Sequence, residues 1–205
     1  MSLRNKLCFF ILGLLILDQV VKIWIKTHMM IGDEINVLGD WFKIHFIENN
    51  GMAFGMGSEN GKFGKILLSV FRIGAVAAIG WYISKLLKDK APVGVIFSFA
   101  LIFCGAIGNI FDSMFYGLLF NDSNMQIATF LPEDGGYAPF LQGKVVDMLY
   151  FPLFTGFMPD WVPIWGGEYC EFFRPVFNLA DSYITIGVIL LILFHRSFFS
   201  DKKEV

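Results

Sequence analysis

Charged residues are scarce in this 205-residue chain: they make up 17% of it, whereas 56% of the residues are hydrophobic and the mean hydropathy is +0.61. Such a composition does not supply enough polar groups to cover a globule in water, which excludes an ordinary soluble domain. The net charge of −2, without a basic cluster, gives no sign of nucleic-acid binding. We therefore expect an integral membrane protein that binds no nucleic acid.

Cysteine and histidine are also scarce, with three of each. An odd number of cysteines does not make a complete disulfide framework, and Cys8 and Cys104 lie in apolar segments, where cysteine behaves as a small hydrophobic residue. The histidines are dispersed along the chain. The spacing therefore predicts no metal site and no cofactor.

Long hydrophobic runs, in contrast, are plentiful, and four of them reach the length of about 20 residues that a helix needs to cross a bilayer. We place these spans near residues 6–26, 66–86, 93–117 and 176–195, which leaves two long loops at 27–65 and 118–175. Lys and Arg flank the N-terminus, the 85–91 connection and the C-terminus, so the positive-inside rule places both termini in the cytoplasm and both loops outside. The expected fold is an all-α, four-helix transmembrane bundle in a single domain, 1–205.

The first long loop contains one strand-like segment, Trp41 to Ile47, in which apolar and polar side chains alternate. This pattern predicts a half-exposed strand. The glycine-rich stretch that follows, residues 48–61, fits a turn or interfacial segment that lets backbone approach a ligand, and fits a plain flexible hairpin about as well.

Acidic residues inside the spans are the candidates for a function, because a charge at mid-span costs roughly 2.5–3.5 kcal/mol. Asp18 lies four residues before Lys22, so the two share a helix face and can pair. Asp112 ends a stripe of small residues, and Asp181 lies about one turn inside the fourth span. Span direction and rise per residue place these acids in the outer half of the membrane, and Asp147, in the outer loop, can dip to the same level.

Two carboxylates held close together in a low-dielectric site share a proton, and such a pair can activate water toward a peptide carbonyl. A cluster of acids also suits a proton or cation carrier, or a non-catalytic scaffold with a structural polar network. The acids concentrate in the outer half, and no comparable row of polar residues continues through the inner half, which argues against a carrier. The residues alone leave all three functions open.

Five motifs occur in order along the chain: LDQVVK at 17–22, NNGMAFG at 49–55, CGAIGNIFD at 104–112, GKVVDM at 143–148 and FNLADSYITIG at 177–187. Together they resemble the motif regions of the lipoprotein signal peptidase (signal peptidase II) family, over nearly the whole chain. The resemblance implies an aspartyl endopeptidase of the bacterial plasma (inner) membrane. Its substrates would be prolipoproteins, cut just before the cysteine that carries a diacylglyceryl group.

The resemblance also implies the site. Asp147 and Asp181 would form the catalytic pair, facing the outer side, and supporting or substrate-binding positions would be Asp18, Lys22, Asn50, Gly51, Gly108, Asn109, Asp112, Asn178 and Ala180. We expect Asn178 to orient a carboxylate or the scissile carbonyl, and Gly108 to let the substrate backbone approach. No metal or cofactor is expected. The enzyme would act as a monomer on substrates that arrive from the membrane lipid.

The family's outer β cradle and interfacial helix would correspond to the 41–47 strand and to part of 51–65. Two features depart from the family pattern. Ser113 stands where the family usually has Arg, so a charge partner for the site must come from elsewhere or is absent. Residues 118–142 and 152–174 look like insertions, and the aromatic-rich part of the second predicts an anchor in the headgroup zone.

Overall fold

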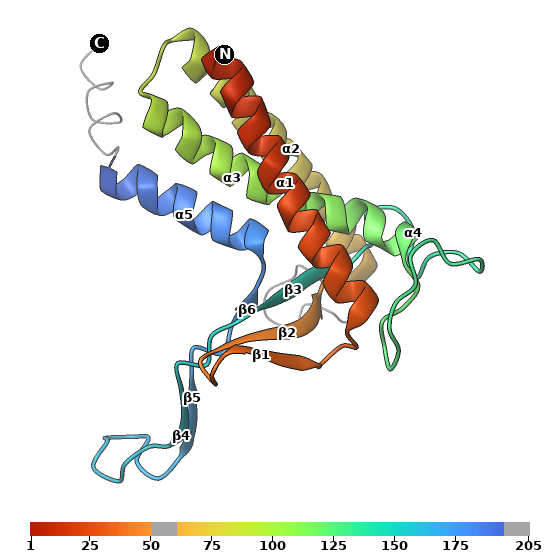
Figure 1. The fold of residues 1–205 in the computed structure, drawn as a ribbon, viewed down its shortest axis with the longest axis vertical. Helices are drawn as coiled ribbons and strands as arrows, with labels where there is room; N and C mark the ends of the chain where they lie inside the picture. The colour runs from red at the N-terminus through yellow and green to blue at the C-terminus, as the bar shows by residue number, and fades with distance from the viewer. Residues whose placement is uncertain (51–60, 195–205) are drawn as a thin grey trace.

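The computed structural model describes residues 1–50 and 61–194, in which apolar helices stand on a small sheet at one end (Figure 1). Three helical segments among these residues are long and apolar enough to cross a membrane: α1 (Leu3–His28), α2 (Gly61–Lys88, apolar from Gly64), and α3 (Val93–Phe111) with its extension to Leu119. The expectation of a multi-span membrane protein is therefore confirmed. The fourth apolar helix, α5 (Leu179–Phe194), has 16 residues and begins after a short strand.

The surface of α1 shows which environment the helices suit. Its exposed apolar side chains recur every three to four residues and thus form one stripe: Phe9, Leu12, Ile16, Val20 and Trp24. The opposite face buries Asp18, Lys22 and Lys26. A helix that is apolar outside and charged inside is the inverse of a helix on a water-soluble protein, and it fits a lipid-facing helix with a polar site behind it.

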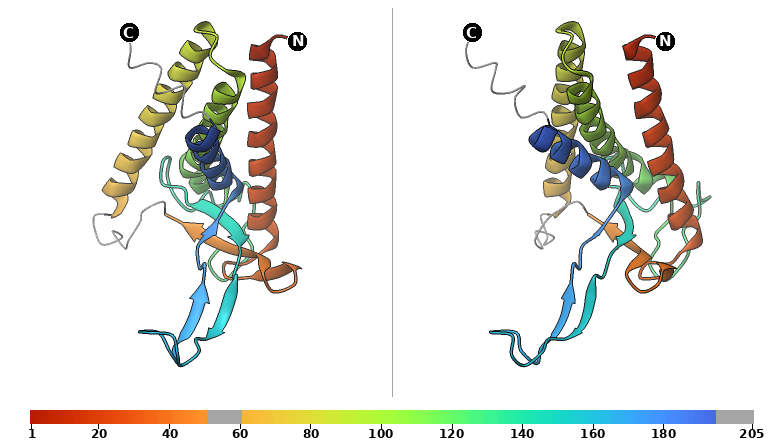
Figure 2. Two further views of the ribbon diagram at one scale, coloured as in Figure 1. Left: turned by 90° about the vertical axis from the view of Figure 1, so that its left-hand side faces the viewer. Right: turned by 60° about the vertical axis from the view of Figure 1, so that its left-hand side comes forward.

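The N-terminus and the α2–α3 connection lie at the same end of the helices, and the sheet lies at the other end (Figures 1 and 2). Ser2 caps α1, because its Oγ accepts a hydrogen bond from the Asn5 backbone N–H at 3.2 Å. The connection after α2 turns at Lys90, which has a φ of 51°, and α3 follows Pro92. Proline suits this position because it has no N–H to leave unpaired at the helix start.

The end of α3 is not a regular α-helix. A π-helical turn, η1 (Asp112–Tyr116), and a short α4 (Gly117–Leu119) follow it. The inserted segment 118–142 returns against this turn, and the Gly143 N–H donates to the Ser113 carbonyl at 2.8 Å. A Cβ at Gly143 would lie 2.2 Å from the Asp112 carbonyl oxygen, so only glycine allows this approach. Asp112, at the start of this turn, is fully buried.

Four antiparallel strands form the main sheet in the order β1 (Glu34–Leu38), β2 (Phe42–Asn49), β3 (Val145–Tyr150) and β6 (Val176–Phe177). Strand β2 confirms the strand predicted at 41–47. The sheet is larger than the single strand that we expected, since β1, β3 and β6 were not predicted. Asp147 thus lies within a strand, where we had expected a loop.

The register of the sheet positions Asp147. Leu149 of β3 pairs with Phe177 of β6, while Asp147 lies opposite Ile47 of β2. Because β6 runs directly into α5, this pairing brings the middle of β3 beside the first turn of α5. Two segments about 30 residues apart in sequence therefore meet at one point.

The second insertion folds as a hairpin, β4 (Phe154–Phe157) with β5 (Tyr169–Phe172), which projects away from the helices (Figure 2). Its tip carries exposed Trp161 and Ile164. The sequence had indicated an aromatic anchor here but no strands. Most of the segment 51–65, where we expected an interfacial helix, lies outside the described residues, as does Gly51.

Helices α3 and α5 pack closely through glycine. A Cβ at Gly105 would lie 2.1 Å from the Ala180 carbonyl oxygen, and one at Gly187 would lie 2.7 Å from the Ser98 carbonyl oxygen. Small residues at such contacts let two helix backbones approach within a membrane. The close approach also brings the start of α5 to the end of α3, where Asn109 and Asp112 lie.

We therefore expect Gly105→Ala to destabilise the protein by about 1–3 kcal/mol, because the new methyl group meets backbone that cannot move aside. Gly13→Ala is the control, since a Cβ there has nothing within 4 Å. That control should leave stability unchanged or raise it by up to about 1 kcal/mol through helix propensity. Thermal unfolding in detergent measures both, and equal melting temperatures would contradict the packing role of Gly105.

Candidate active site

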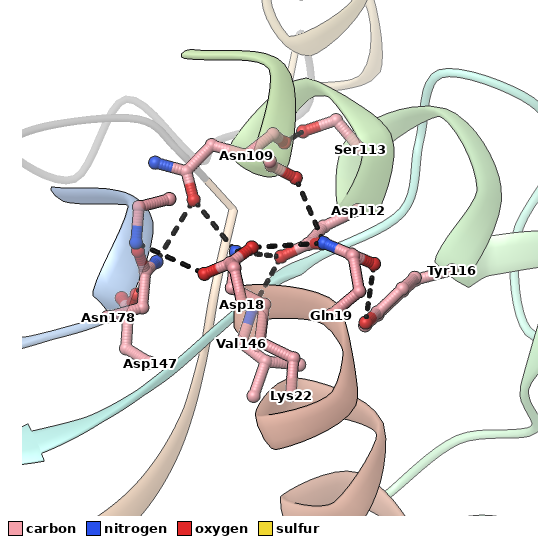
Figure 3. A network of polar contacts seen from close by, with 12 residues as sticks. Asp18, Gln19, Lys22, Asn109, Asp112, Ser113, Tyr116, Val146, Asp147 and Asn178 are labelled. Carbon is pink, nitrogen blue, oxygen red and sulfur yellow. Dashed lines mark hydrogen bonds and ion pairs between the residues drawn. The ribbon is translucent and has the colours of Figure 1, made fainter. Parts of the chain in front are cut away.

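Lys22 is the centre of a buried polar network at the sheet end of the helices (Figure 3). Its Nζ lies 3.0 Å from Asp18 Oδ2 and 2.9 Å from Asp112 Oδ2, and it donates to Asn109 Oδ1 at 3.1 Å. The predicted Asp18–Lys22 pair is confirmed, and Asp112 joins it from α3. The three charged side chains are at most 1% exposed, and the lysine offsets much of the cost of burying two carboxylates.

Gln19 completes the contacts of Asp112, and the sequence analysis missed it. Its Nε2 donates to Asp112 Oδ1 at 3.0 Å and to Asp18 Oδ2 at 3.1 Å, and its Oε1 accepts from the Tyr116 hydroxyl at 3.0 Å. Asp112 Oδ2 also accepts the Val146 backbone N–H at 3.4 Å. Asp112 therefore ties strand β3 to the network. The available sequence signal was the place of Gln19 beside Asp18 in LDQVVK.

The start of α5 is a reciprocal cap made by Asn178 and Asp181. The Asp181 N–H donates to Asn178 Oδ1 at 2.9 Å, and the Asn178 N–H donates to Asp181 Oδ2 at 3.3 Å. This is the capping-box arrangement, in which the residue before the helix and its third residue satisfy each other's free N–H groups. The helix dipole also favours a carboxylate in this first turn.

Asp18 reinforces the same helix end, because its Oδ1 accepts the Ala180 N–H at 3.1 Å. Gly108 makes this contact possible: a Cβ there would lie 2.7 Å from Asp18 Oδ2 and 3.2 Å from the Ala180 Cβ. From the sequence we expect Gly108 to admit the substrate backbone, whereas the contacts in the structure are with Asp18 and Ala180. The space beside this glycine is filled by α1 and α5, so Gly108 serves helix packing.

Asn109 and Asn178 connect the lysine cluster to the remaining two carboxylates. Asn109 Nδ2 donates to Asp181 Oδ1 at 2.7 Å, and Asn109 Oδ1 accepts from Asn178 Nδ2 at 3.0 Å. Asn178 Nδ2 also donates to Asp147 Oδ1 at 2.7 Å. Asn178 is fully buried, whereas Asn109 and Asp181 are partly exposed. One asparagine thus contacts both Asp147 and Asp181.

Asp147 is held from two sides, because its Oδ2 accepts from Asn49 Nδ2 at 3.2 Å. Burial, and then the charge of nearby Asp181, raise the pKa of Asp147 to about 6, although the hydrogen bonds from Asn49 and Asn178 oppose the shift. The four acids singled out from the sequence, Asp18, Asp112, Asp147 and Asp181, therefore meet in one connected network.

Asn50 does not reach the carboxylates in the contacts that the structure describes. Its Oδ1 instead accepts from Lys65 Nζ at 3.2 Å, and the neighbouring Asn49 contacts Asp147. Asn50, which we expect among the supporting or substrate-binding positions, lies just after β2, whereas Asn49 is the last residue of that strand. The contact of Asn49 with Asp147 was not anticipated from the sequence.

Ser113 makes a local contact, its Oγ donating to the Asn109 carbonyl at 3.0 Å. The positive charge that the family's Arg would supply comes from other helices. Lys22 of α1 serves Asp18 and Asp112, and Arg72 of α2 lies close enough to Asp181 for their charges to interact.

A pocket of about 320 Å³ opens beside Asp181. Its lining is mainly apolar and comes from the end of the inserted segment, from β6 and from the first turns of α5: Phe173, Phe177, Asp181, Ser182, Thr185 and Ile186. Across residues 1–50 and 61–194, no group of three or more His, Cys, Asp or Glu side chains is arranged to hold a metal ion. The side chains that the structure brings together here are carboxylates and amides beside a mainly apolar pocket.

A family model described as signal peptidase (SPase) II matches residues 10–197. The chain belongs to the signal peptidase II family. The lipoprotein signal peptidase of Porphyromonas gingivalis is 50% identical over 181 residues, which are 88% of this chain and 78% of that protein. That of Amoebophilus asiaticus is 38% identical over 185 residues, 89% of this chain and 74% of that protein.

A solved structure of a bacterial membrane enzyme has the same fold, with a TM-score of 0.61 and 26% identity, and the match covers 98% of this chain and 93% of that one. These findings confirm the resemblance drawn from the five motifs. The signal peptidase II chain is thus an aspartic endopeptidase embedded in a membrane.

The Lys22 network makes a prediction about stability. Lys22→Met leaves Asp18 and Asp112 buried without a cation, so we expect a loss of about 3–5 kcal/mol. The matched control is Lys43→Met, which removes a partly exposed pair with Glu34 on the sheet and should cost at most about 1 kcal/mol. Thermal unfolding in detergent compares the two variants. A Lys22→Met protein as stable as the control would refute the claim that Lys22 stabilises the buried Asp18 and Asp112.

Proposed function

We propose that this signal peptidase II removes the signal peptide of diacylglyceryl-modified prolipoproteins just before the lipidated cysteine, with Asp147 and Asp181 as its catalytic pair. The observation that carries the assignment is the double contact of Asn178, which bonds to Asp147 through its side chain and caps α5 together with Asp181. Among the acids of the network, these two are not neutralised by Lys22 contacts. They are therefore the pair that remains available for acid–base chemistry.

The proposed mechanism follows from the coupling between the two carboxylates. Burial, and then the charge of Asp181, raise the pKa of Asp147, so the pair retains one proton more readily than two isolated aspartates would. The ionised member takes a proton from a water molecule, which attacks the scissile carbonyl, and the protonated member donates a hydrogen bond to that carbonyl oxygen. Asn109 and Asn178 act as positioning residues, because each donates to a carboxylate oxygen at 2.7 Å.

The proposed membrane arrangement is a four-helix core in a bacterial inner membrane, with α5 as the fourth span. The basic residues Arg4, Lys6, Lys85, Lys88 and Lys90 flank the helix ends opposite the sheet. This distribution supports cytoplasmic termini and a site toward the outer face. A substrate whose acyl chains stay in the bilayer reaches the pocket beside Asp181 sideways from the lipid.

The arrangement does not favour the alternative of a proton or cation carrier. At the end of the helices opposite the sheet, Leu7, Leu86, Val95 and Ile96 belong to a buried apolar cluster that joins α1, α2 and α3. Within the described residues, the polar network therefore stops partway along the helices. A non-catalytic scaffold, in turn, has no need of two coupled carboxylates beside an open pocket.

The first test is removal of either carboxylate. Asp147→Asn and Asp181→Asn should each lower processing of a diacylglyceryl-modified prolipoprotein by about 10³-fold or more, because the pair acts as a unit. A gel-shift assay on the purified full-length variants measures the loss. Asp40→Asn, an exposed carboxylate in the turn between β1 and β2, should process normally. Normal processing by either dyad variant would refute the assignment.

The second test is the pH dependence of cleavage. Burial and the charge of Asp181 raise the folded-state pKa of Asp147 above its ordinary value, to about 6. The pair therefore keeps its shared proton below about pH 6 and loses it as the pH rises above that value. Two ionised carboxylates leave no acid for the carbonyl oxygen. We therefore expect kcat/KM to fall as the pH is raised from about 5 to 8. A steady rise of kcat/KM over the same range would contradict the proposal that Asp147 and Asp181 share one proton.

A further inference from the structure

A second cluster of buried charges surrounds Glu48 of β2, apart from the Lys22 network. Lys26, near the end of α1, forms an ion pair with Glu48 Oε1, and Ser123 Oγ donates to the same oxygen at 2.9 Å. Lys144 Nζ donates to Glu48 Oε2 at 2.9 Å. The Lys26 and Glu48 side chains are 0% and 3% exposed, and that of Lys144 is 26% exposed. Glu48 thus receives donors from three different segments.

The first of these segments is the inserted loop 118–142, which the cluster attaches to α1. Lys26 Nζ donates to Ser123 Oγ at 2.6 Å, and the Lys26 carbonyl accepts the Ala128 N–H at 3.3 Å. Ser123 is fully buried. The loop is therefore fixed to the end of α1 through both a side chain and the backbone.

The second segment is the start of β3. Lys144 is the residue directly before this strand, and its own N–H donates to the Tyr137 hydroxyl of the loop at 2.6 Å. Within the sheet, Glu48 pairs with Val146, and the next pair is Ile47 with Asp147. Only two residues, Val145 and Val146, therefore separate Lys144 from Asp147 of the proposed catalytic pair.

Lys65 of α2 holds the same two chain ends from another side. Its Nζ donates to Asn50 Oδ1 at 3.2 Å and to the Gln142 carbonyl at 2.8 Å. Asn50 follows β2, and Gln142 lies shortly before β3. Both α1, through Lys26, and α2, through Lys65, therefore contact the region where the end of β2 meets the start of β3.

The charges around Glu48 favour a fixed arrangement of the segments that meet there. Burial favours the protonated form of Glu48, but the charges and hydrogen bonds of Lys26 and Lys144 outweigh it and lower the pKa of Glu48 below its ordinary value. A buried ion pair adds little net stability compared with apolar packing, whereas its directional contacts specify one arrangement of the segments that it joins. The arrangement specified here is that of β3.

We propose that Glu48 is a positioning residue for catalysis: through Lys26, Ser123 and Lys144 it joins the inserted loop and β3 to α1, and thereby fixes Asp147 at the start of α5. The inference rests on the proposed function of Asp147. It assigns the 118–142 insertion the task of holding the catalytic strand in place, without contact with the substrate.

The test measures kcat and KM separately for full-length protein in detergent, with a diacylglyceryl-modified prolipoprotein as substrate. Lys144→Met keeps the buried Lys26–Glu48 pair but releases β3. We expect kcat to fall on the order of 10- to 100-fold with KM nearly unchanged, because a small displacement of a catalytic group acts on the chemical step. Lys144→Arg, which keeps a donor for Glu48, should restore most of kcat.

Lys43→Met is the matched control, because it removes a lysine–glutamate contact on the same strand β2 but on its exposed side. It should have the kcat and KM of the wild type. Melting temperatures confirm that each variant is folded at the assay temperature. Should Lys144→Met prove unfolded, Ser123→Ala decides, since it removes only the contacts of a hydroxyl group and should lower kcat in the same way.

An unchanged kcat in the folded Lys144→Met or Ser123→Ala protein would overturn the inference. So would a raised KM with normal kcat, since that pattern would mean that the loop contacts the substrate. Failure of the wild type and Lys43→Met to process the prolipoprotein would overturn the proposed function itself, and the two failures are therefore distinguishable.

Discussion

One buried ammonium group decides how the helices of this protein meet. Asp18 and Asp112 would repel each other and lose hydration in the interior, and Lys22 between them makes their burial tolerable. Each carboxylate also accepts a backbone N–H from another element: Asp18 accepts that of Ala180 in α5, and Asp112 accepts that of Val146 in β3. The ion cluster is thus structural, yet it orients the two elements that carry Asp147 and Asp181.

The start of α5 combines a structural and a chemical task. Asn178 and Asp181 satisfy free N–H groups of the helix, as residues at a helix start commonly do. The same two side chains face Asp147 and Asn109. The Asp181 carboxylate is thus held by the Asn178 N–H within the cap and by the Asn109 side chain from α3. The signal peptidase II chain therefore obtains a rigid acid from an ordinary helix cap.

The helices and the identity of the acids could be predicted from the sequence, because hydrophobic length and the cost of intramembrane charge are local properties. The i,i+4 spacing of Asp18 and Lys22 likewise predicted their pair. Contacts that depend on long-range pairing could not be predicted: β3 was taken for a loop, and the contacts of Gln19, Asn49 and Arg72 were overlooked. Strand register and helix rotation decide those contacts, and neither is written in a single segment. The close approach of Asp18 and Ala180 to Gly108 likewise could not be foreseen from the sequence.

The antiparallel pairing of β3 has a consequence for how this membrane protein matures. Successive side chains of a strand point to opposite faces, so a slip by one residue would turn Asp147 away from α5 while leaving every helix in its place. Placing the helices is therefore not enough to bring Asp147 beside Asp181. With these two residues as the proposed catalytic pair, enzymatic turnover becomes a sensitive reporter of correct strand pairing.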